Sequence, residues 1–485
     1  MMAQRRAIWV FLALGAGVAL SYAELPALLI VVTLAVITVG CLTTPLVPFA
    51  VMLLISPLRA LILTESPDAL PFDVGQMLFV SFVISWFLHL LIHKRSLRGV
   101  LRRSPVLAAV GLFLIGAGGS AFAAISLHAW MTEWLKWFQI AGITIIVVDI
   151  VRTESAAWLA FAVVAAALAN AGVGIYEYFG GSGALHLLIN EQNFRAFGTF
   201  GQPNPFGGFM GMAAPIAIAM TGFSAYRLWQ RRAFHDELVW RTAAVAFYCL
   251  AAATITFALF ASWSRGAWLA FAVSLSVAAI ALPHRLTRAG IMLVLGLTVL
   301  GFISAGGFLP TSIMARISSV TNEFSAASDV RGVDVTPENY ANLERLAHWQ
   351  AAVSMATVNP WLGIGFGNYE IAYLDYSLLF WDMPLGHAHN YYLNVLGETG
   401  MIGAITYVIM FCTVAICAWR LRRHPDSAFR LIGIGTLCSW VYLAVHSLTD
   451  NLYVNALFLH IGTIIALVAV LYDDLFARRK WLRNA

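Results

Sequence analysis

Long apolar runs recur along almost the whole chain and are separated by short polar segments. A run of about 20 apolar residues can cross the ~30 Å hydrocarbon core of a bilayer as a helix, which satisfies its own backbone polar groups there. Hydrophobic residues make up 60% of the chain, charged residues only 11%, and the mean hydropathy is +0.80. These values exclude a soluble globular protein. We therefore predict an all-α polytopic membrane protein.

Fourteen segments have the length and apolar character of membrane spans. They lie near residues 7–22, 25–43, 47–64, 74–92, 106–126, 132–150, 155–178, 205–224, 243–262, 266–282, 289–309, 400–419, 428–446 and 454–473. The first three are short or interrupted by Pro45, Pro48 and Pro57, and proline breaks helices, so 12 or 13 spans also fit the pattern. The prediction is about 12–14 transmembrane helices, with the first kept as an anchor.

Basic residues are distributed very unevenly between the loops on the two sides. One set of loops holds 22 of the 29 Lys and Arg residues, among them those of 94–103 and 478–483. Because basic loops stay in the cytoplasm, these loops and both termini are predicted to be cytoplasmic. The net charge of +5 and the pI near 9.0 then follow from topology and do not indicate nucleic-acid binding.

One outward segment, residues 310–399, is too long to be a simple connector. It divides the chain into four parts. These are N-terminal transmembrane helices (1–150), central transmembrane helices with outward arginine-containing loops (151–309), the long periplasmic loop (310–399), and C-terminal transmembrane helices with a basic cytoplasmic tail (400–485).

The middle of the long loop is predicted to be helical. Thr336 would be the N-cap, Pro337 would lie in the first turn, and the helix would end near Val358. It carries Arg345 and His348, and its apolar side would consist of Leu343, Leu346, Ala347 and Val353. The Gly363-x-Gly365-x-Gly367 run that follows has no preceding strand, so it is not a dinucleotide loop. We expect it to bring the backbone close to the bilayer or to a lipid headgroup.

Seven basic residues remain on the predicted outer side, where each is a candidate contact for an anion. They are Arg59, Lys136, Arg195, Arg265, Arg316, Arg331 and Arg345. Arg195 lies in a segment broken by Gly and Pro, shortly before Asn204; the alternative is a re-entrant turn with an interfacial arginine. Arg265 lies in a hairpin that joins two spans almost directly, which favours a function over an ordinary loop arginine.

The long loop ends in His387-Ala388-His389-Asn390. An imidazole at the edge of a bilayer is suited to proton transfer near neutral pH. His387 and His389 are also possible metal ligands, but no third ligand with a recognised spacing lies nearby, so no metal is predicted. Asp450 and His446 lie at another outward end and could orient groups, although a structural role is favoured for both.

These motifs resemble the O-antigen ligase superfamily of membrane glycosyltransferases. Arg265 to Leu269 matches its Arg-x3-Leu motif, and His389-Asn390, nine residues, then Gly400-x-x-Gly403 match its histidine motif. The segments 197–205 and 359–369 are similar to two further blocks of the family. The resemblance covers roughly residues 190–455 and implies a GT-C-like fold of about twelve spans with one long periplasmic loop that carries short helices.

The resemblance implies an inverting, metal-independent glycosyltransferase of the bacterial inner membrane whose active site faces the periplasm and which needs no cofactor. The donor would be an undecaprenyl-diphosphate-linked glycan. Arg195, Arg265 and Arg345 would bind its diphosphate, with Arg265 also catalytic, and His389 would be the general base. The supporting residues would be Asn204, Asn390, Glu398 and Asp450.

The acceptor is left open by these residues, because the donor chemistry is shared. The first choice is lipid A-core, as in an O-antigen ligase. A second lipid-linked glycan would make the protein a polymerase, and a Ser or Thr hydroxyl would make it a protein O-oligosaccharyltransferase. A transporter of lipid-linked sugars is the alternative from another class. It is disfavoured because the polar residues gather at one surface rather than at the bilayer midplane.

Overall fold

The computed structural model describes residues 35–40, 43–65, 74–94, 104–181, 188–189, 193–231, 235–282, 329–331, 333–336, 339–378 and 380–484. Within these residues the regular structure is helical except for one antiparallel pair of two-residue strands, β1 (Leu188–Ile189) and β2 (Asn193–Phe194). The prediction of an all-α polytopic membrane protein is confirmed.

Nine helices in this described part of the chain are long and apolar enough to cross a bilayer. They are α5 (Val74–Ile92), α6 (Pro105–Gly118, continued by a 3-10 turn), α7 (Leu127–Ile150), α8 (Ala156–Tyr178), α9 (Pro203–Arg231), α10 (His235–Ala261), α16 (Tyr391–Leu421), α17 (Ser427–His446) and α18 (Leu457–Asn484). Shorter apolar helices are α3 (Leu46–Ile55) with α4 (Arg59–Glu65), and α11 (Arg265–Ala281). The predicted spans 7–22 and 289–309, and most of 25–43, lie outside the described residues.

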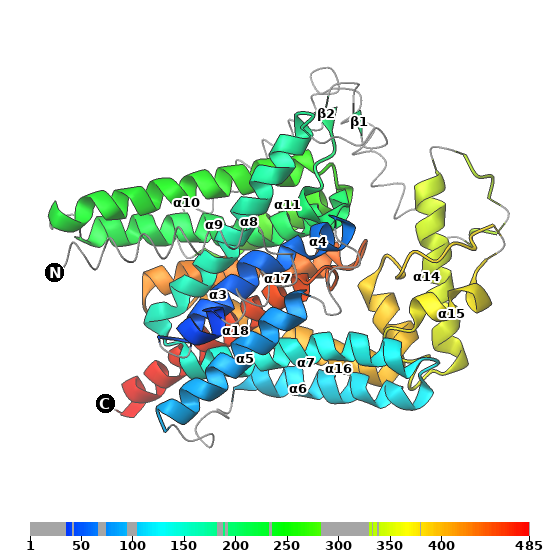
Figure 1. Cartoon of the computed structure of the whole chain (residues 1–485), viewed down its shortest axis with the longest axis horizontal. Helices are drawn as coiled ribbons and strands as arrows, with labels where there is room; N and C mark the ends of the chain where they lie inside the picture. Colours follow the sequence, from blue (N-terminus) through cyan, green and yellow to red (C-terminus); the bar gives the residue numbers. More distant parts are fainter. Residues whose placement is uncertain are drawn as a thin grey trace.

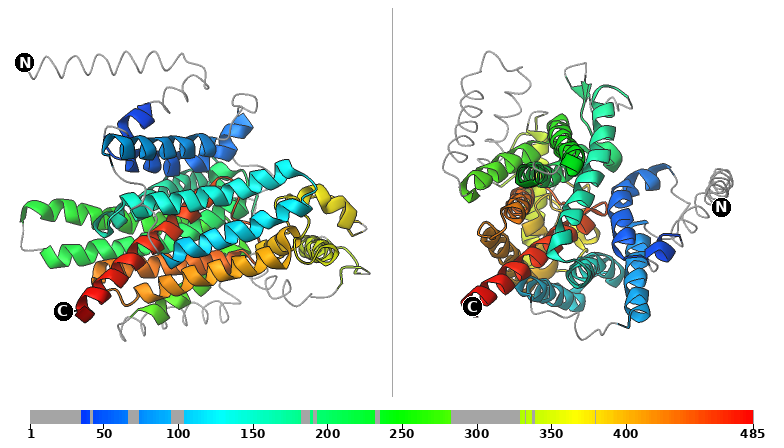
Figure 2. Two further views of the ribbon diagram at one scale, coloured as in Figure 1. Left: turned by 90° about the horizontal axis from the view of Figure 1, so that it is seen from below. Right: turned by 90° about the vertical axis from the view of Figure 1, so that its left-hand side faces the viewer.

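The helix α18 runs through the middle of the bundle (Figures 1 and 2). In its apolar window 83% of the residues are buried, whereas the corresponding share for the peripheral helix α10 is 28%. Figure 2 shows α3, α4 and α5 together on one flank. The helices α9 and α17 are tied by polar contacts, since the Tyr442 hydroxyl donates to the Gly207 carbonyl (3.0 Å) and the Ser439 hydroxyl to that of Met212 (2.6 Å). Such bonds stabilise helix pairs inside a membrane.

Helices α14 (Tyr340–Val358) and α15 (Tyr369–Tyr376) form a lobe at one end of the bundle, away from the C-terminal end of α18 (Figure 1). The predicted start of α14 was wrong: Asn339 is the N-cap, and its Oδ1 accepts the Thr336 N–H (2.8 Å), so Thr336 lies in the turn before the helix. Pro337 lies outside the described residues.

The apolar face of α14 follows the helical period. Leu343, Leu346 and Ala347 are buried as predicted, but Val353 is 45% exposed. The buried face continues at four-residue intervals, so Ala351 and Met355 take the place expected for Val353.

The Gly363-x-Gly365-x-Gly367 run brings its backbone close to other backbone of the protein, whereas the sequence led us to expect the bilayer or a lipid headgroup. All three glycines have positive φ, a conformation that L side chains rarely adopt. A Cβ on Gly363 would lie 2.4 Å from the carbonyl carbon of Glu398, and one on Gly367 would lie 2.7 Å from the carbonyl oxygen of Ala129. The glycines therefore allow residues 359–369 to lie directly on the backbones of α16 and α7.

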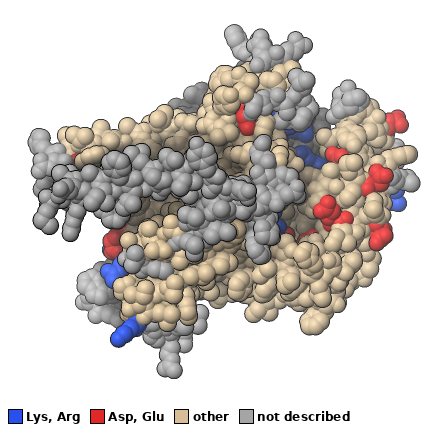
Figure 3. Space-filling model, in the orientation of Figure 1, with Lys and Arg blue, Asp and Glu red and all other residues tan. Residues whose placement is uncertain are grey.

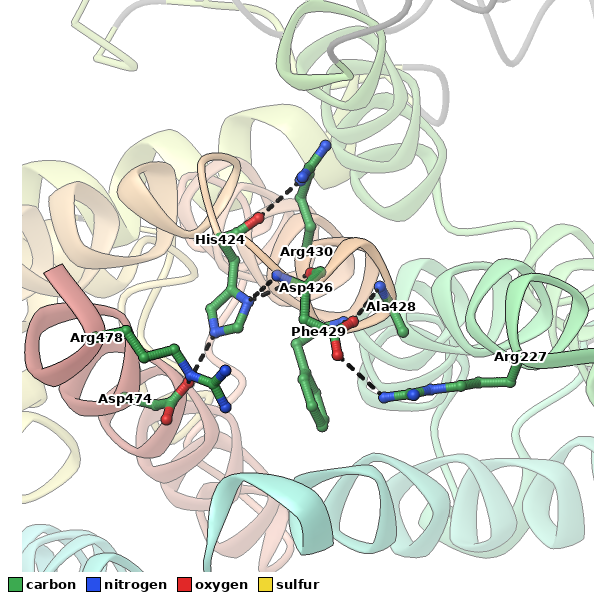
Figure 4. A network of polar contacts seen from close by, with 8 residues as sticks. All are labelled: Arg227, His424, Asp426, Ala428, Phe429, Arg430, Asp474 and Arg478. Carbon is green, nitrogen blue, oxygen red and sulfur yellow. Dashed lines mark hydrogen bonds and ion pairs between the residues drawn. The ribbon is translucent and has the colours of Figure 1, made fainter. Parts of the chain in front are cut away.

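A polar network connects α9, α17 and α18 at the opposite end of the bundle (Figure 4). The buried His424 ring has Nε2 3.1 Å from Asp474 Oδ2, and its Nδ1 accepts the Asp426 N–H (3.2 Å). Asp426 caps α17 by accepting the Ala428 N–H (2.8 Å), and its other oxygen pairs with Arg227 (3.2 Å). One carboxylate therefore holds both a helix start and a neighbouring helix.

We expect Asp426→Ala to lower the free energy of unfolding by about 1 kcal/mol, because α17 loses its N-cap. Asp426→Asn should cost only a few tenths of a kcal/mol, since asparagine also caps helices and a half-exposed ion pair contributes little. Thermal unfolding in detergent would measure both. Equal destabilisation by the two variants would show that the ion pair, rather than the cap, is what matters.

Candidate active site

Three arginines that are distant in sequence line one pocket of about 190 Å³. Arg195 follows β2, Arg265 is the first residue of α11, and Arg345 lies on α14. The other lining residues are Asn204, Ser264, Gly266, Ala341, His446, Thr449 and Asp450. Figure 3 shows Lys and Arg side chains in a hollow beside the α14–α15 lobe and carboxylates on the outer surface of that lobe. The structure thus brings the three arginines proposed for diphosphate binding together.

The loop that carries Arg195 is held by two polar side chains inside the apolar helix α8. The Glu177 carboxylate accepts the N–H groups of Phe197 (2.9 Å) and Gly198 (2.6 Å), and Asn170 Oδ1 accepts from Thr199. Sequence reasoning missed both residues. The signal was available, because a carboxylate and an amide inside a membrane span are rare and usually have partners.

The Arg195 guanidinium is oriented by two acceptors. Its Nε donates to the Ser262 carbonyl (3.1 Å), and a terminal nitrogen donates to Asn204 Oδ1 (3.3 Å). Asn204 therefore supports the site by positioning an arginine. Since Ser262 lies in the hairpin before Arg265, the Arg195 side chain also connects its own loop to that hairpin.

Arg265 occupies the first turn of α11, and its guanidinium donates to Asn342 Oδ1 on α14 (3.4 Å). The preceding hairpin is strained, because Trp263 has a φ of 52°. The first turns of α9 and α11 both reach the pocket, where they contribute Asn204 and Gly266. A helix N-terminus is itself electropositive, so an arginine there is unfavourable unless an anion binds between them. With Asp450 as the one carboxylate among its lining residues, the pocket keeps an excess of positive charge.

His389 is held in an uncommon conformation just before α16, with a φ of 52°. Asn390 is the N-cap of α16, and its Oδ1 accepts the N–H groups of Tyr392 (3.1 Å) and Leu393 (3.2 Å). Asn394 Oδ1 accepts the Ala388 N–H (3.0 Å), and the Tyr391 N–H donates to the Ser447 carbonyl beyond α17 (2.8 Å). These bonds fix the backbone on both sides of His389.

Asp450 connects His389 to the arginine pocket. Its Oδ1 lies 3.6 Å from His389 Nδ1, while the same carboxylate lines the pocket. Burial raises the pKa of Asp450, but the facing His389, His387 and His446 outweigh burial and hold the pKa below its usual range. At 3.6 Å this is an electrostatic contact, and it favours the His389 tautomer that carries its hydrogen on Nδ1 and leaves Nε2 as the acceptor.

His387, His389 and Asp450 also form a group that could hold a metal, with ligand atoms within 4.8 Å of one another. Asp450 is the third ligand that the local sequence did not reveal. However, His387 Nδ1 accepts the His389 N–H (3.1 Å), so a neutral His387 carries its hydrogen on Nε2, the atom that faces Asp450 at 3.6 Å. A metal-bound histidine instead donates from its second nitrogen. The hydrogen bonding therefore fits an imidazole–carboxylate contact better than a metal site.

Glu398, expected to support catalysis, does not line the pocket. Its Oε1 accepts the Tyr369 N–H (2.9 Å), and its carbonyl accepts the Gly365 N–H (2.9 Å), so it holds residues 359–369 against α16. Two of the other basic residues that were predicted to be outward are paired locally, Lys136 with Glu133 and Arg331 with Asp329. Arg59 is not among the pocket residues, and Arg316 lies outside the described part of the chain.

His348 on α14 lies beneath the His389 segment and is 1% exposed. Its Nδ1 is 2.8 Å from the Tyr369 hydroxyl, its ring stacks on Tyr373, and its ring centroid lies 5.9 Å from that of His389. Burial, and then the nearby His389 and His387, lower the pKa of His348 to about 4.

We expect acidification from pH 7.5 to 5 to lower the melting temperature, and His348→Gln to weaken this dependence. Histidine in the unfolded chain titrates near pH ~6.5, whereas folded His348 has a pKa of about 4. Its contribution is therefore complete above the unfolded pKa and is lost as the pH falls toward the folded one. The exposed His128, changed to Gln, is the control. An unchanged pH dependence in His348→Gln would contradict the assignment.

A known protein family and a known protein are each similar to part of this chain. A family model described as O-antigen ligase matches residues 250–408, which include Arg265, Arg345 and His389 but neither Arg195 nor Asp450. A stretch of 301 residues, 60% of this chain, is 25% identical to the General O-oligosaccharyltransferase of Acinetobacter baylyi. The match spans 46% of that relative, less than half its length. Residues 250–408 of this chain are therefore similar to the O-antigen ligase family.

Proposed function

We propose that the protein is a membrane glycosyltransferase that moves a glycan from a polyprenyl diphosphate to an acceptor hydroxyl. The observation that carries this proposal is the convergence of Arg195, Arg265 and Arg345 on one pocket that shares Asp450 with His389. Guanidinium groups bind phosphate oxygens bidentately and stay charged at all relevant pH values. The family match and the oligosaccharyltransferase relative support the same chemistry.

In the proposed reaction, His389 Nε2 accepts the proton of the acceptor hydroxyl while the oxygen attacks the anomeric carbon of the donor sugar. The bond between that carbon and the diphosphate oxygen breaks, and its electron pair stays on the diphosphate. Attack from the side opposite the leaving group inverts the anomeric centre. The arginines stabilise the negative charge that grows on the diphosphate, so neither a metal nor a cofactor is required in this scheme.

The proposed location is the bacterial inner membrane, with undecaprenyl diphosphate as the lipid and the pocket facing the periplasm. The distribution of Lys and Arg supports this orientation. Arg227 and Arg478 belong to the network at the end of the bundle away from α14 (Figures 1 and 4). That end would be cytoplasmic, together with both termini.

Lipid A-core is the first proposed acceptor, which would make the protein an O-antigen ligase, in accord with the description of the matching family. Transfer to a protein hydroxyl is the second candidate. The Acinetobacter baylyi relative favours it, and so does the exposed acidic surface of the α14–α15 lobe (Figure 3), which includes Glu370, Asp375 and Asp382. Such a surface repels an acceptor that carries phosphate groups.

The deciding experiment offers the purified protein one defined lipid-diphosphate oligosaccharide and three acceptors in separate reactions with EDTA. The acceptors are lipid A-core, excess lipid-linked repeat unit and a serine-rich peptide. We expect product on lipid A-core. A ladder of lipid-linked glycans would show a polymerase, and a glycopeptide would show the second candidate. Movement of the lipid across vesicles without any product would replace the enzyme by a transporter, and activity restored only by added metal would overturn the metal-free scheme.

A further inference from the structure

His446, the last residue of α17, is buried against the arginine pocket without a hydrogen-bond partner. The residue is 1% exposed and lines the pocket together with Arg265 and Arg345. Neither Nδ1 nor Nε2 makes a hydrogen bond of good geometry within the described residues, and the Gly266 backbone is the nearest group that acts on the ring. Buried polar groups are nearly always paired, because an unpaired one loses its hydration without replacement. An imidazole with both nitrogens unpaired beside a polar pocket indicates a partner that the chain itself does not supply.

The surroundings of the ring leave its edges for that partner. Tyr442 stacks on the ring, with centroids 5.6 Å apart and planes at 21°, so packing uses the face of the imidazole. Glycines flank both nitrogens: a Cβ on Gly208 would lie 3.1 Å from Nε2, and a Cβ on Gly266 would lie 3.5 Å from Nδ1. Side chains at these two positions would crowd the nitrogens, and glycine avoids this.

The charges of the pocket determine what the imidazole can bind. Burial of the ring disfavours a second proton on His446, and the three arginines and two helix N-termini outnumber the one carboxylate, Asp450, that would favour it. A neutral imidazole has one N–H donor and one acceptor nitrogen. The oxygens of an ionised diphosphate ester only accept hydrogen bonds, so its binding site must supply hydrogen-bond donors. Asp450, the only carboxylate among the lining residues, lies 3.6 Å from both His387 and His389 and acts on His446 through its charge without a hydrogen bond.

We propose that His446 is a neutral hydrogen-bond donor to the diphosphate of the bound donor lipid, and so a fourth binding group of the arginine pocket. This inference rests on the proposed function. When the bond from the sugar carbon to the diphosphate oxygen breaks, the electron pair remains on the diphosphate, which gains one negative charge. The His446 N–H stays on the imidazole and its hydrogen bond strengthens as that charge grows, while the acceptor proton goes to His389.

The test compares His446→Phe, which keeps the ring and its packing on Tyr442 but removes the N–H, with His446→Gln, which keeps a donor. Binding of undecaprenyl diphosphate without a glycan is measured with the full chain in nanodiscs, next to KM and kcat for transfer. We expect His446→Phe to weaken diphosphate binding about tenfold or more, and His446→Gln to recover most of the affinity. The control is His460→Phe, a buried histidine on α18 that contacts Ser56 and does not line the pocket.

Wild-type affinity in His446→Phe would overturn the inference, and so would a loss in His446→Gln as large as that in His446→Phe. If His446→Phe does not insert into the membrane, His446→Ala replaces it in the same comparison with Gln. The experiment distinguishes failure of the proposed glycosyltransferase function from failure of the proposed role of His446. A wild-type protein that transfers no glycan but binds the diphosphate through His446 contradicts the proposed function alone. A protein that transfers glycan equally well with Phe at this position contradicts this inference alone.

Discussion

The substitution His389→Ala is expected to lower the rate of glycan transfer by a factor of about 10²–10⁴, the range typical of a lost general base. A sugar hydroxyl is a poor nucleophile until its proton is accepted, and the alanine variant has no group at the position of Nε2. Binding of the diphosphate should change little, because His389 is not among the residues that line the arginine pocket. Initial rates with a saturating lipid-linked donor would measure the effect as a fall in kcat.

The matched control is His128→Ala, which removes an exposed histidine from the start of α7 and should leave the rate unchanged. Melting temperatures of both variants show whether the fold is retained. A His389→Ala protein that is folded and as active as the wild type would remove the histidine from the proposed mechanism. A rise in KM at constant kcat would instead make His389 a binding residue.

The substitution Arg265→Lys is expected to lower kcat/KM by about tenfold to a hundredfold although it keeps the positive charge. Lysine has no planar fork, so it cannot bind two phosphate oxygens and Asn342 at the same time. The loss should be larger in kcat than in donor affinity, because charge on the diphosphate grows as the bond to the sugar breaks.

Arg331→Lys is the matched control. Arg331 belongs to the same half of the chain, but it is exposed and paired with Asp329, so its replacement should leave kcat/KM within error of the wild type. Equal activity of the Arg265→Lys variant and the wild-type protein would contradict bidentate binding of the diphosphate by Arg265. In that case the guanidinium geometry would have no role, and Arg265 would act only as one of several positive charges in the pocket.

The sequence predicts the arginine pocket because topology limits where outward residues can lie. The distribution of basic residues predicts that Arg195, Arg265 and Arg345 lie on the same side of the membrane, which would place them at one end of the bundle, and they line one pocket. The same argument names Lys136 and Arg331, which pair with nearby carboxylates instead. The side of the membrane on which a residue lies can be predicted from the sequence, whereas the residue that it contacts depends on how the helices pack.

The partners of the site residues could not be predicted for this reason. Asp450 lies far along the chain from His389, and only the packing of α17 against the start of α16 brings the two together. The periodicity of α14 predicts a buried face but not what covers it, and Val353 falls on the wrong side. The Gly363-x-Gly365-x-Gly367 run signals a close approach of the backbone, yet nothing local shows that the other backbone is that of α16.

A break in α16 lies between the segment that carries His389 and the later, apolar turns of the helix. Gly400, with a φ of 60°, interrupts α16, and the backbone of Trp361 lies against it, so a Cβ there would be 2.4 Å from the Trp361 carbonyl carbon. The turns before Gly400 are anchored to Ser447, while the turns after it lie in the apolar part of the helix. Directly after the break, the N–H groups of Met401 and Ile402 donate to the carbonyls of Pro360 (2.8 Å) and Trp361 (3.3 Å). The loop segment therefore clamps both halves of α16, which should move as one unit when the helix tilts with hydrocarbon thickness.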